Sequence, residues 1–345
     1  MNPSRCSVSS LLEVRNLSIT IRPPHSPALP IVRDISFSVE RGQVLAVLGE
    51  SGSGKSMTIK SILRLLPSSS HVSGEAVLSG KNLFTLSERE MAGLRGDRIA
   101  MIFQDPMSSL DPVFPVGDQI CEALRRHRSL NKSEAWQHAV ASLGSLGIAR
   151  PEERMADYPH QLSGGMCQRV MIAMALACSP DLLLADEPTS ALDVTGQAQI
   201  LNLLDELRRD SGLGLVLVTH DVGVAAALAD EVAVMYAGEL VEYGPVEEVL
   251  RRPRHPYTAG LIRANVGSAH RGPLRPISGQ PPEPASLPPG CAFSPRCSHI
   301  AQRCTEQCPV LQQLVDVRAR HGVRCLRVQE EGLQLEQEEL LLAAV

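Results

Sequence analysis

The chain has 345 residues, and 33 Lys and Arg against 38 Asp and Glu give a net charge of −5. At about 100 to 200 residues per domain, this length predicts two domains, or one large domain with an appendage, and excludes a single small module. The acidic balance and the lack of a basic block argue against a nucleic-acid-binding surface. With 43% apolar and 21% charged residues, the composition is that of a globular protein with a sizeable core.

The sequence predicts a cytosolic protein. No apolar run reaches the roughly 18 residues that a membrane-spanning helix requires. Residues 1–10 lack the basic start and apolar core of a secretory signal. The nine cysteines are an odd number, and in a reducing compartment they are poor disulfide candidates.

The predicted elements begin with an antiparallel hairpin, formed by residues 12–21 and 31–39 around a proline-rich insert. Short apolar runs typical of strands buried on both faces follow at 44–48, 98–103, 182–185 and 213–219. Apolar residues at helical spacing alternate with them at 55–66, 165–178 and 197–209. This alternation predicts an α/β fold with a largely parallel sheet.

The other segments differ from this core. Residues 110–158 lack strand patterns and predict an inserted helical subdomain, and residues 231–243 predict a second hairpin that turns at Ala237-Gly238. Residues 271–290 hold seven prolines and predict an irregular linker to a cysteine-rich tail. The acidic, leucine-bearing stretch 329–345 predicts a surface or partner-contacting helix.

A glycine-rich loop follows the strand predicted at 44–48. Its residues fit G-x-x-x-x-G-K-[ST] and are Gly49, Glu50, Ser51, Gly52, Ser53, Gly54, Lys55 and Ser56. Glycines let backbone N–H groups converge on phosphates, and the helix N-terminus adds partial positive charge. Lys55 would reach the β- and γ-phosphates, and the Ser56 hydroxyl would coordinate Mg²⁺. A glycine-rich turn with a solvated lysine is the alternative, which eight residues in register disfavour.

Two acids close the buried run at 182–185. Asp186 is predicted to face the metal, and Glu187, one residue further, to hold and deprotonate the attacking water. Two acids at a strand end are commonplace on their own. Together with the phosphate loop, they predict a site that hydrolyses a nucleoside triphosphate.

Three further motifs complete a recognisable series. Leu162, Ser163, Gly164, Gly165 and Met166 precede the acids, and this order resembles the ATP-binding cassette (ABC) family, whose signature loop has this form. Gln104 resembles the Q-loop of that family and His220 its switch histidine, although in isolation each would more often be a satisfied polar group. The segment after the acids resembles the D-loop of the family and consists of Ser190, Ala191, Leu192 and Asp193.

The resemblance implies an α/β fold of the P-loop NTPase ABC type. Its parts would be a RecA-like parallel-sheet core, an N-terminal antiparallel β-subdomain, an inserted helical subdomain and a Cys-rich C-terminal extension. The implied boundaries are an N-terminal tail at 1–10, an ABC domain at 11–266 with helical subdomain at about 110–160, a linker at 267–290 and the extension at 291–345.

The same resemblance implies roles for the site residues. Catalysis would fall to Lys55, Glu187 and His220, and Mg²⁺ would be bound by Ser56, Gln104 and Asp186. Two cassettes would pack head to tail, so that the signature loop of one contacts the ATP held by Lys55 of the other. ATP would then bridge the two cassettes and hold them together, and its hydrolysis would let them separate.

A narrower resemblance comes from residues 103–112, 255–258 and 290–297, which are similar to bacterial oligopeptide, dipeptide and nickel importers. It implies an ATP-hydrolysing subunit, peripheral to the cytoplasmic face of the inner membrane, that energises uptake of oligopeptides, dipeptides or a related solute. The implied partners are a second ABC ATPase subunit in a hetero- or homodimer, two integral membrane permease subunits and an extracytoplasmic solute-binding protein. A soluble non-transport ABC ATPase and a regulatory module without turnover are the alternatives.

The cysteine spacing adds a cofactor prediction. Cys291, Cys297, Cys304 and Cys325 resemble the cysteines of related importer ATPases that carry a [4Fe–4S] cluster, for which four thiolates are the usual ligands, and Cys308 is then extra. Spacing alone does not separate a cluster from zinc or from unligated thiols.

Two positions depart from the family pattern. The region where an aromatic residue usually stacks on adenine holds Ile21 and Arg22, with no aromatic residue before Phe37. We therefore expect adenine to rest on Ile21 or under Arg22, with modest selectivity for ATP over GTP. Cys167 occupies a position where the peptide-importer branch typically has arginine, and this change is expected to weaken contact with nucleotide or the second cassette.

Overall fold

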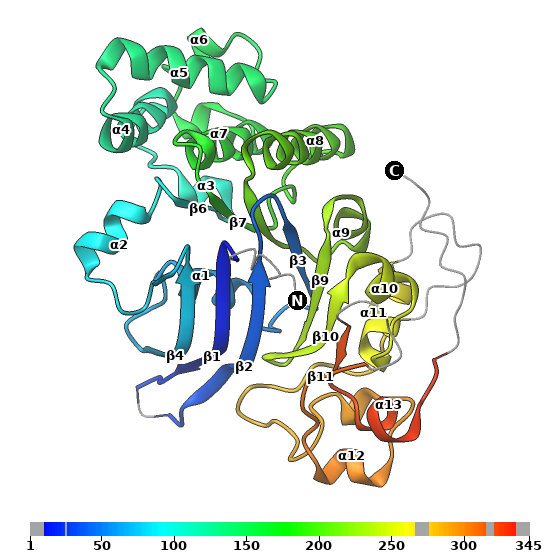
Figure 1. The fold of residues 1–345 in the computed structure, drawn as a ribbon. Coiled ribbons are helices and arrows are strands. Elements are labelled where there is room, and N and C mark those ends of the chain that lie inside the picture. The colour runs from blue at the N-terminus through cyan, green and yellow to red at the C-terminus, as the bar shows by residue number, and fades with distance from the viewer. Residues whose placement is uncertain (1–9, 25, 266–275, 315–320, 336–345) are drawn as a thin grey trace, which may run out of the picture. The chain divides into compact units, whose positions relative to one another are not determined.

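The computed structural model describes residues 10–24, 26–265, 276–314 and 321–335 (Figure 1). The chain divides into two compact units. Each unit combines segments that are distant in sequence. The first comprises Met1–Leu12, Val39–Gln43 and Ser79–Leu217, and the second comprises Glu13–Ser38, Val44–Leu78 and Val218–Val345. These units do not follow the predicted domain boundaries, which stay predictions.

The second unit contains a mixed sheet with the order β11-β12-β10-β9-β3. Its strands are β3 (Val44–Leu48), β9 (Glu231–Tyr236), β10 (Glu239–Pro245), β11 (Gln312–Gln313) and β12 (Gly322–Val323). β3 is buried throughout and runs parallel to β9, which explains its uninterrupted apolar sequence. β9 and β10 form the predicted hairpin, and β12 then pairs antiparallel with β10. Two short strands from the C-terminal part of the chain, β11 and β12, thus belong to the same sheet as β3.

A smaller sheet in the second unit has the order β2-β1-β4, from β1 (Leu12–Ile21), β2 (Leu29–Val39) and β4 (Ser70–Leu78). The N–H of Asn16 donates to Ser36 Oγ at 2.8 Å, and that of Asp34 donates to Ser18 Oγ at 2.9 Å. The two partners run in opposite directions, so the predicted antiparallel hairpin is confirmed. β4 has no counterpart in the prediction, because half of its residues are polar or glycine and it lacks a continuous apolar pattern.

In the first unit, three core strands have the order β8-β7-β6. They are β6 (Ile99–Ile102), β7 (Leu182–Asp186) and β8 (Gly214–Val218), and β6 runs parallel to β7. Every residue of these strands is buried, as the apolar runs predict. The short β5 (Lys81–Asn82) also belongs to this unit.

The helices of the first unit include the predicted helical stretch after residue 110. They are α2 (Glu88–Leu94), α3 (Pro106–Ser109), α4 (Val116–Arg128), α5 (Lys132–Ser145), α6 (Pro151–Arg154), η1 (Pro159–Gln161), α7 (Gly164–Leu176) and α8 (Val194–Ser211). α5 begins with a capping box between Asn131 and Glu134, and α8 ends at Gly212, which has a φ of 69°. These end signals fix the helix boundaries.

The second unit carries shorter helices. They are α1 (Lys55–Ile62), α9 (Val222–Leu228), α10 (Val246–Arg251), α11 (Pro256–Asn265), η2 (Ser294–Arg296), α12 (Gln302–Glu306) and α13 (Leu326–Glu331). α1 ends earlier than predicted, because Arg64 has a φ of 56°, which no α-helix tolerates. In the described part of the chain, no helix is both long and apolar enough to cross a membrane.

The helix predicted at 329–345 is present at residues 329–331, the end of α13, and is wrong for residues 332–335. α13 stops at Glu331, because Gly332 has a left-handed φ of 64°, and residues 332–335 are not helical. Residues 336–345 lie outside the described residues, as do residues 1–9 of the predicted tail and residues 266–275 of the predicted linker. Residues 276–290 of that linker contain no helix or strand.

Candidate functional site

The glycine-rich loop connects β3 to α1 with three residues in backbone conformations that favour glycine. The φ angles are 151° at Gly49, 79° at Gly52 and 104° at Gly54. A Cβ atom on Gly49 would lie 2.3 Å from the carbonyl oxygen of Met235 in β9. The loop therefore needs glycine here both for its backbone angle and for close packing on the neighbouring strand.

Lys55 is the buried centre of this loop. Its side chain is only 7% exposed, and Nζ donates to the carbonyl oxygens of Gly49 at 2.7 Å and Glu50 at 2.9 Å. The loop thus holds an ammonium group at the start of α1, where Gly54 is the N-cap residue and Ser56 is half-buried in the first turn. A fixed cation beside a helix N-terminus is an arrangement that binds anions such as phosphates.

Replacing Gly49 with alanine should break this loop. We expect Gly49→Ala to destabilise the loop by about 1 to 3 kcal/mol, because a methyl group meets a backbone oxygen at an unfavourable φ. Titration with a fluorescent ATP analogue should show at least a tenfold weaker affinity. Gly52→Ala is the matched control, since its Cβ would meet no atom within 4 Å and only the φ penalty remains. Equal affinities of Gly49→Ala and the unmodified protein would contradict this explanation.

His220 lies in the same unit as the loop. The N–H of Thr219 donates to the carbonyl oxygen of Val47 at 3.2 Å, so the segment that carries His220 runs beside the end of β3. His220 is exposed. Asp221, the next residue, caps α9 by accepting the N–H of Gly223 at 2.7 Å. The structure therefore brings the predicted switch histidine to the strand edge from which the phosphate loop begins.

The first unit holds the acidic part of the candidate site. β6 and β7 are parallel and pair Ile102 with Ala185, so that Gln104 and the two acids follow their strands at the same sheet edge. Gln104 Nε2 donates to Glu187 Oε2 at 3.3 Å. Asp186 is 1% exposed at the end of β7, and Glu187 is half-buried with a φ of 50°. The predicted Q-loop and the predicted base are thus in direct contact.

The signature loop and the D-loop also come together in the first unit. Ser163 is the N-cap of α7 and accepts the N–H of Met166 at 3.3 Å, while its hydroxyl can still donate. A Cβ on Gly165 would lie 3.3 Å from Leu192 Cδ2. A hollow of about 420 Å³ is lined from both motifs by Ser163, Gly165, Met166, Ala191, Leu192 and Asp193. Leu162 is buried, and Gly164 and Ser190 are exposed.

The predicted metal donors belong to both units. Ser56 lies in the second unit, and Gln104 and Asp186 lie in the first. Oxygen donors of this kind suit Mg²⁺, which keeps several waters and binds few protein groups. Among the residues that the structure describes, no three His, Cys, Asp or Glu side chains converge as ligands of a metal ion.

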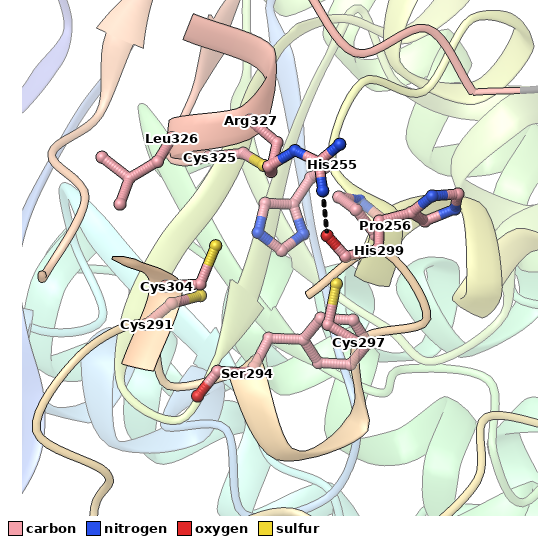
Figure 2. Close-up of a pocket in the computed structure, with 11 residues that line it drawn as sticks. His255, Pro256, Cys291, Ser294, Cys297, His299, Cys304, Cys325, Leu326 and Arg327 are labelled. Carbon is pink, nitrogen blue, oxygen red and sulfur yellow. Dashed lines mark hydrogen bonds between the residues drawn. The ribbon is translucent and has the colours of Figure 1, made fainter. Parts of the chain in front are cut away.

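The four cysteines predicted to bind a cofactor line one cavity in the second unit. Figure 2 shows Cys291, Cys297, Cys304 and Cys325 around this space, with His255 beside them. The N–H of Cys291 donates to the carbonyl oxygen of Cys304 at 2.8 Å. Burial raises the pKa of Cys291 to about 12 and that of Cys297 to about 11. Nearby positive charge, such as a metal, would be needed to hold these sulfurs as thiolates at neutral pH.

Cys308 does not line this cavity. It is exposed, and its Sγ donates to the carbonyl oxygens of Pro289 at 3.1 Å and Gly290 at 3.4 Å. This placement agrees with the prediction that Cys308 is the extra cysteine.

Two residues that the sequence motifs do not include contact the phosphate loop from the C-terminal part of the chain. Arg296 forms an ion pair with Glu50, and the Tyr257 hydroxyl accepts the N–H of Glu50 at 2.9 Å. Both residues lie in segments that the sequence marks by resemblance alone, 255–258 and 290–297. Their contact with the loop has no local sequence signal.

The structure also shows the surroundings of the residues that depart from the family pattern. Ile21 is half-buried at the end of β1, and Arg22, the next residue, is exposed. The N–H of Arg22 donates to the carbonyl oxygen of Ser69 at 2.9 Å. Cys167 is fully buried, its thiol donates to the Pro159 carbonyl oxygen at 3.4 Å, and burial raises its pKa. The Cys167 side chain is thus buried where α7 packs on its neighbours.

Comparisons with known proteins agree on one family. Residues 32–190 match the family model described as ABC transporter, and residues 241–304 match the model described as oligopeptide/dipeptide transporter, C-terminal region. The dipeptide transport ATP-binding protein DppD of Bacillus subtilis is 45% identical over 92% of this chain and 98% of its own length. The oligopeptide transport ATP-binding protein OppD of Salmonella typhimurium is 45% identical over 87% of this chain and 90% of its own length.

A solved structure gives the same fold. It is the dimeric, post-hydrolysis state of the ATP-binding cassette MJ0796 bound to ADP and Pi, with a TM-score of 0.62 and 27% identity over 68% of this chain and 98% of that chain. The predicted ABC cassette fold is therefore confirmed. The alternative of a soluble non-transport ATPase is wrong, because the relatives are named as transport proteins along nearly their whole length.

Proposed function

Because this chain belongs to the ATP-binding proteins of the ABC transporter family, we propose that it is the ATP-hydrolysing subunit of a bacterial importer of oligopeptides, dipeptides or a related solute. The observation that carries this proposal is the continuous likeness to DppD and OppD, which includes the C-terminal region named after oligopeptide and dipeptide transporters. The alternation of phosphate loop, acidic strand end and signature helix supplies the chemistry that ATP hydrolysis requires.

The residue roles follow from this function. Lys55, held at the loop centre by the Gly49 and Glu50 carbonyl oxygens, binds the β- and γ-phosphates once these anions replace the carbonyls as its partners. Glu187 acts as general base on the attacking water, and His220 contacts the γ-phosphate. Ser56, Gln104 and Asp186 are the residues that would hold Mg²⁺, whose charge supports the developing negative charge on the phosphates.

The signature residues act on a second cassette. Ser163 caps the N-terminus of α7, and both would donate to the γ-phosphate bound by the other subunit. The second subunit is a related ATPase or another copy of this chain. The D-loop residue Asp193 caps α8 next to the same hollow, which supports a shared surface for that contact.

The remaining partners follow from the importer class. Two integral membrane permease subunits would form the solute path, and an extracytoplasmic binding protein would deliver the solute. The chain itself would be peripheral to the cytoplasmic face of the inner membrane. Co-purification with two polytopic membrane proteins, together with peptide-stimulated ATP hydrolysis by that complex, is the expected result. A protein that hydrolyses ATP but never associates with membrane subunits would overturn the importer role.

The cysteine cavity supports a second part of the proposal, a [4Fe–4S] cluster on Cys291, Cys297, Cys304 and Cys325. All four thiols line one cavity, and four thiolates are the usual ligand set of such a cluster. Four thiolates also suit zinc, so zinc and unligated thiols are the alternatives that the purification below distinguishes. The role would be structural or redox-sensing and not part of ATP hydrolysis.

The cofactor prediction is tested by anaerobic purification. We expect a brown protein with broad visible absorbance and about four irons per chain, and Cys297→Ser should lose both. Cys308→Ser is the matched control and should retain them, because Cys308 does not line the cavity. A colourless protein with stoichiometric zinc, or equal iron in both variants, would exclude the cluster.

A further inference from the structure

A residue from the C-terminal part of the chain forms an ion pair with the phosphate loop. Arg296, at the end of η2, reaches Glu50 across 246 positions of sequence. Its Nη1 donates to Glu50 Oε2 at 2.7 Å, and its Nη2 donates to Glu50 Oε1 at 3.0 Å. The Arg296 side chain is 5% exposed. A bidentate, mostly buried pair of this kind is stronger and more directional than an exposed surface ion pair.

The guanidinium of Arg296 is itself fixed on all sides. Nε donates to the carbonyl oxygen of Ser278 at 3.0 Å, and Nη2 also contacts that of Ile277 at 3.4 Å. Nη1 contacts the Tyr236 hydroxyl at 3.4 Å, and the guanidinium carbon lies 5.8 Å from the centre of the Tyr236 ring. Every nitrogen of the group has a partner, so its position relative to Glu50 is defined.

The backbone of Glu50 is held by a second residue from the same region. The Tyr257 hydroxyl accepts the Glu50 N–H at 2.9 Å, and the Tyr257 side chain is fully buried. The Tyr257 ring packs on Tyr236 with centroids 4.6 Å apart, and Phe293 lies against both rings at 5.5 and 5.2 Å. Phe293 belongs to the segment that leads into η2. The aromatic cluster thus supports the same loop residue that Arg296 holds.

These contacts continue to the catalytic lysine. The carbonyl oxygen of Glu50 accepts from Lys55 Nζ at 2.9 Å. The carboxylate, N–H and carbonyl of Glu50 therefore join Arg296, Tyr257 and Lys55 in one chain of hydrogen bonds. Any shift of Glu50 would move both the loop backbone and the group that the lysine ammonium rests on.

We propose that Arg296 is a positioning residue for ATP hydrolysis, which acts through Glu50 to hold the phosphate loop and Lys55 in the geometry that binds the triphosphate. The inference rests on the proposed role of Lys55 and extends the ATP site into the C-terminal part of the chain. The hydrogen-bond partners of Arg296 are Glu50, Tyr236, Ser278 and Ile277, so its effect on Lys55 passes through Glu50. Its effect comes from geometry, since a misplacement of about 1 Å can cost on the order of 100-fold in rate.

The test is steady-state ATP hydrolysis by the purified transport complex. We expect Arg296→Gln to raise the KM for ATP and to lower kcat/KM by about tenfold or more. Arg296→Lys, which keeps the charge but loses the two-pronged contact, should recover only part of this loss. Arg303→Gln is the matched control, because Arg303 pairs with Glu330 and Glu331 within the C-terminal region and does not contact the loop. It should leave both constants unchanged.

A double-mutant cycle separates positioning from mere anchoring of the C-terminal region. If Arg296 acts through Glu50, Arg296→Gln should have little further effect on kcat/KM when Glu50→Gln is already present. Glu50→Gln also tests the same contact from the other side, should Arg296→Gln fold poorly. A lower unfolding temperature with KM and kcat within twofold of the unmodified complex would overturn the proposal.

A second variant, Lys55→Ala, separates failure of the positioning role of Arg296 from failure of the proposed ATP site. If Lys55→Ala left ATP binding intact, the loop itself would not be the nucleotide site. If Lys55→Ala abolished binding while Arg296→Gln changed neither constant, only the positioning role of Arg296 would be wrong.

Discussion

Glu187→Gln is expected to reduce ATP turnover by the transport complex about 10²- to 10⁴-fold, the usual contribution of a positioned general base. The amide keeps the shape of the side chain but cannot take a proton from water. Glu187 lies directly after β7, at the same edge of the β6–β7 pair as Gln104, which donates to its carboxylate at 3.3 Å. Single-turnover measurements with radiolabelled ATP, made at saturating Mg²⁺, would give the rate of the chemical step.

This prediction includes a second observable. ATP binding should persist in Glu187→Gln, because the phosphate loop is unchanged, so the ATP-bound complex should accumulate. Glu206→Gln makes the same change of charge on an exposed residue of α8 and should behave as the unmodified protein. Equal turnover of Glu187→Gln and Glu206→Gln would mean that another group activates the water, or that the chain only binds ATP for regulation.

The second large effect is expected at Lys55. Lys55→Ala removes a buried ammonium group that the loop carbonyl oxygens of Gly49 and Glu50 hold in place. A charge-assisted hydrogen bond contributes about 1.5 to 3 kcal/mol, which corresponds to an ATP affinity about 10- to 100-fold weaker. Isothermal titration with a non-hydrolysable ATP analogue would measure the change in dissociation constant.

Lys60 provides the control for this substitution. It lies on the same helix, α1, and is half-buried at a position away from the loop carbonyl oxygens that bind Lys55. Lys60→Ala removes the same charge from α1, and we expect its affinity for the analogue to stay within about twofold. An unchanged affinity of Lys55→Ala would show that the phosphates bind elsewhere.

The nucleotide-binding motifs could be predicted from sequence because each depends on local chemistry. A run of apolar residues, three glycines and a lysine predict β3, the loop and α1, and the structure has this order with a left-handed φ at Gly52 and Gly54. The same holds for β7, whose buried apolar residues end at Asp186. In both cases the signal lies within a few neighbouring residues, so tertiary packing reinforces the local preference.

Elements without such local signals were missed. β4 is half polar or glycine, and only its pairing with β1 makes it a strand. The stretch after Glu331 carries leucines that suggest a helix, but Gly332 ends α13. The contact between Arg296 and Glu50 joins residues 246 positions apart, and no spacing rule connects them. Such contacts arise from the antiparallel pairing of β12 with β10 and the packing of the aromatic cluster, which only the folded chain reveals.

The spacing of the cysteines does not identify a cofactor. Four of the cysteines line the same cavity and Cys308 does not, which agrees with the grouping that the resemblance implies. The choice of cofactor depends on the distances between sulfurs and on charge, which a spacing pattern does not contain. Gly290 illustrates the structural requirement, since a Cβ there would lie 2.4 Å from the carbonyl oxygen of Cys304. Close approach of the two backbones brings Cys291 and Cys304 together.

The head-to-tail pair of cassettes is most directly tested by a structure of the Glu187→Gln transport complex trapped with ATP and Mg²⁺. Our account predicts that the triphosphate held by Lys55 also receives hydrogen bonds from the signature loop of the second cassette. It further predicts that Ser163 of this chain donates to the nucleotide of that partner. A trapped complex in which Lys55 binds ATP while both signature loops face solvent, without contact to any phosphate, would contradict it.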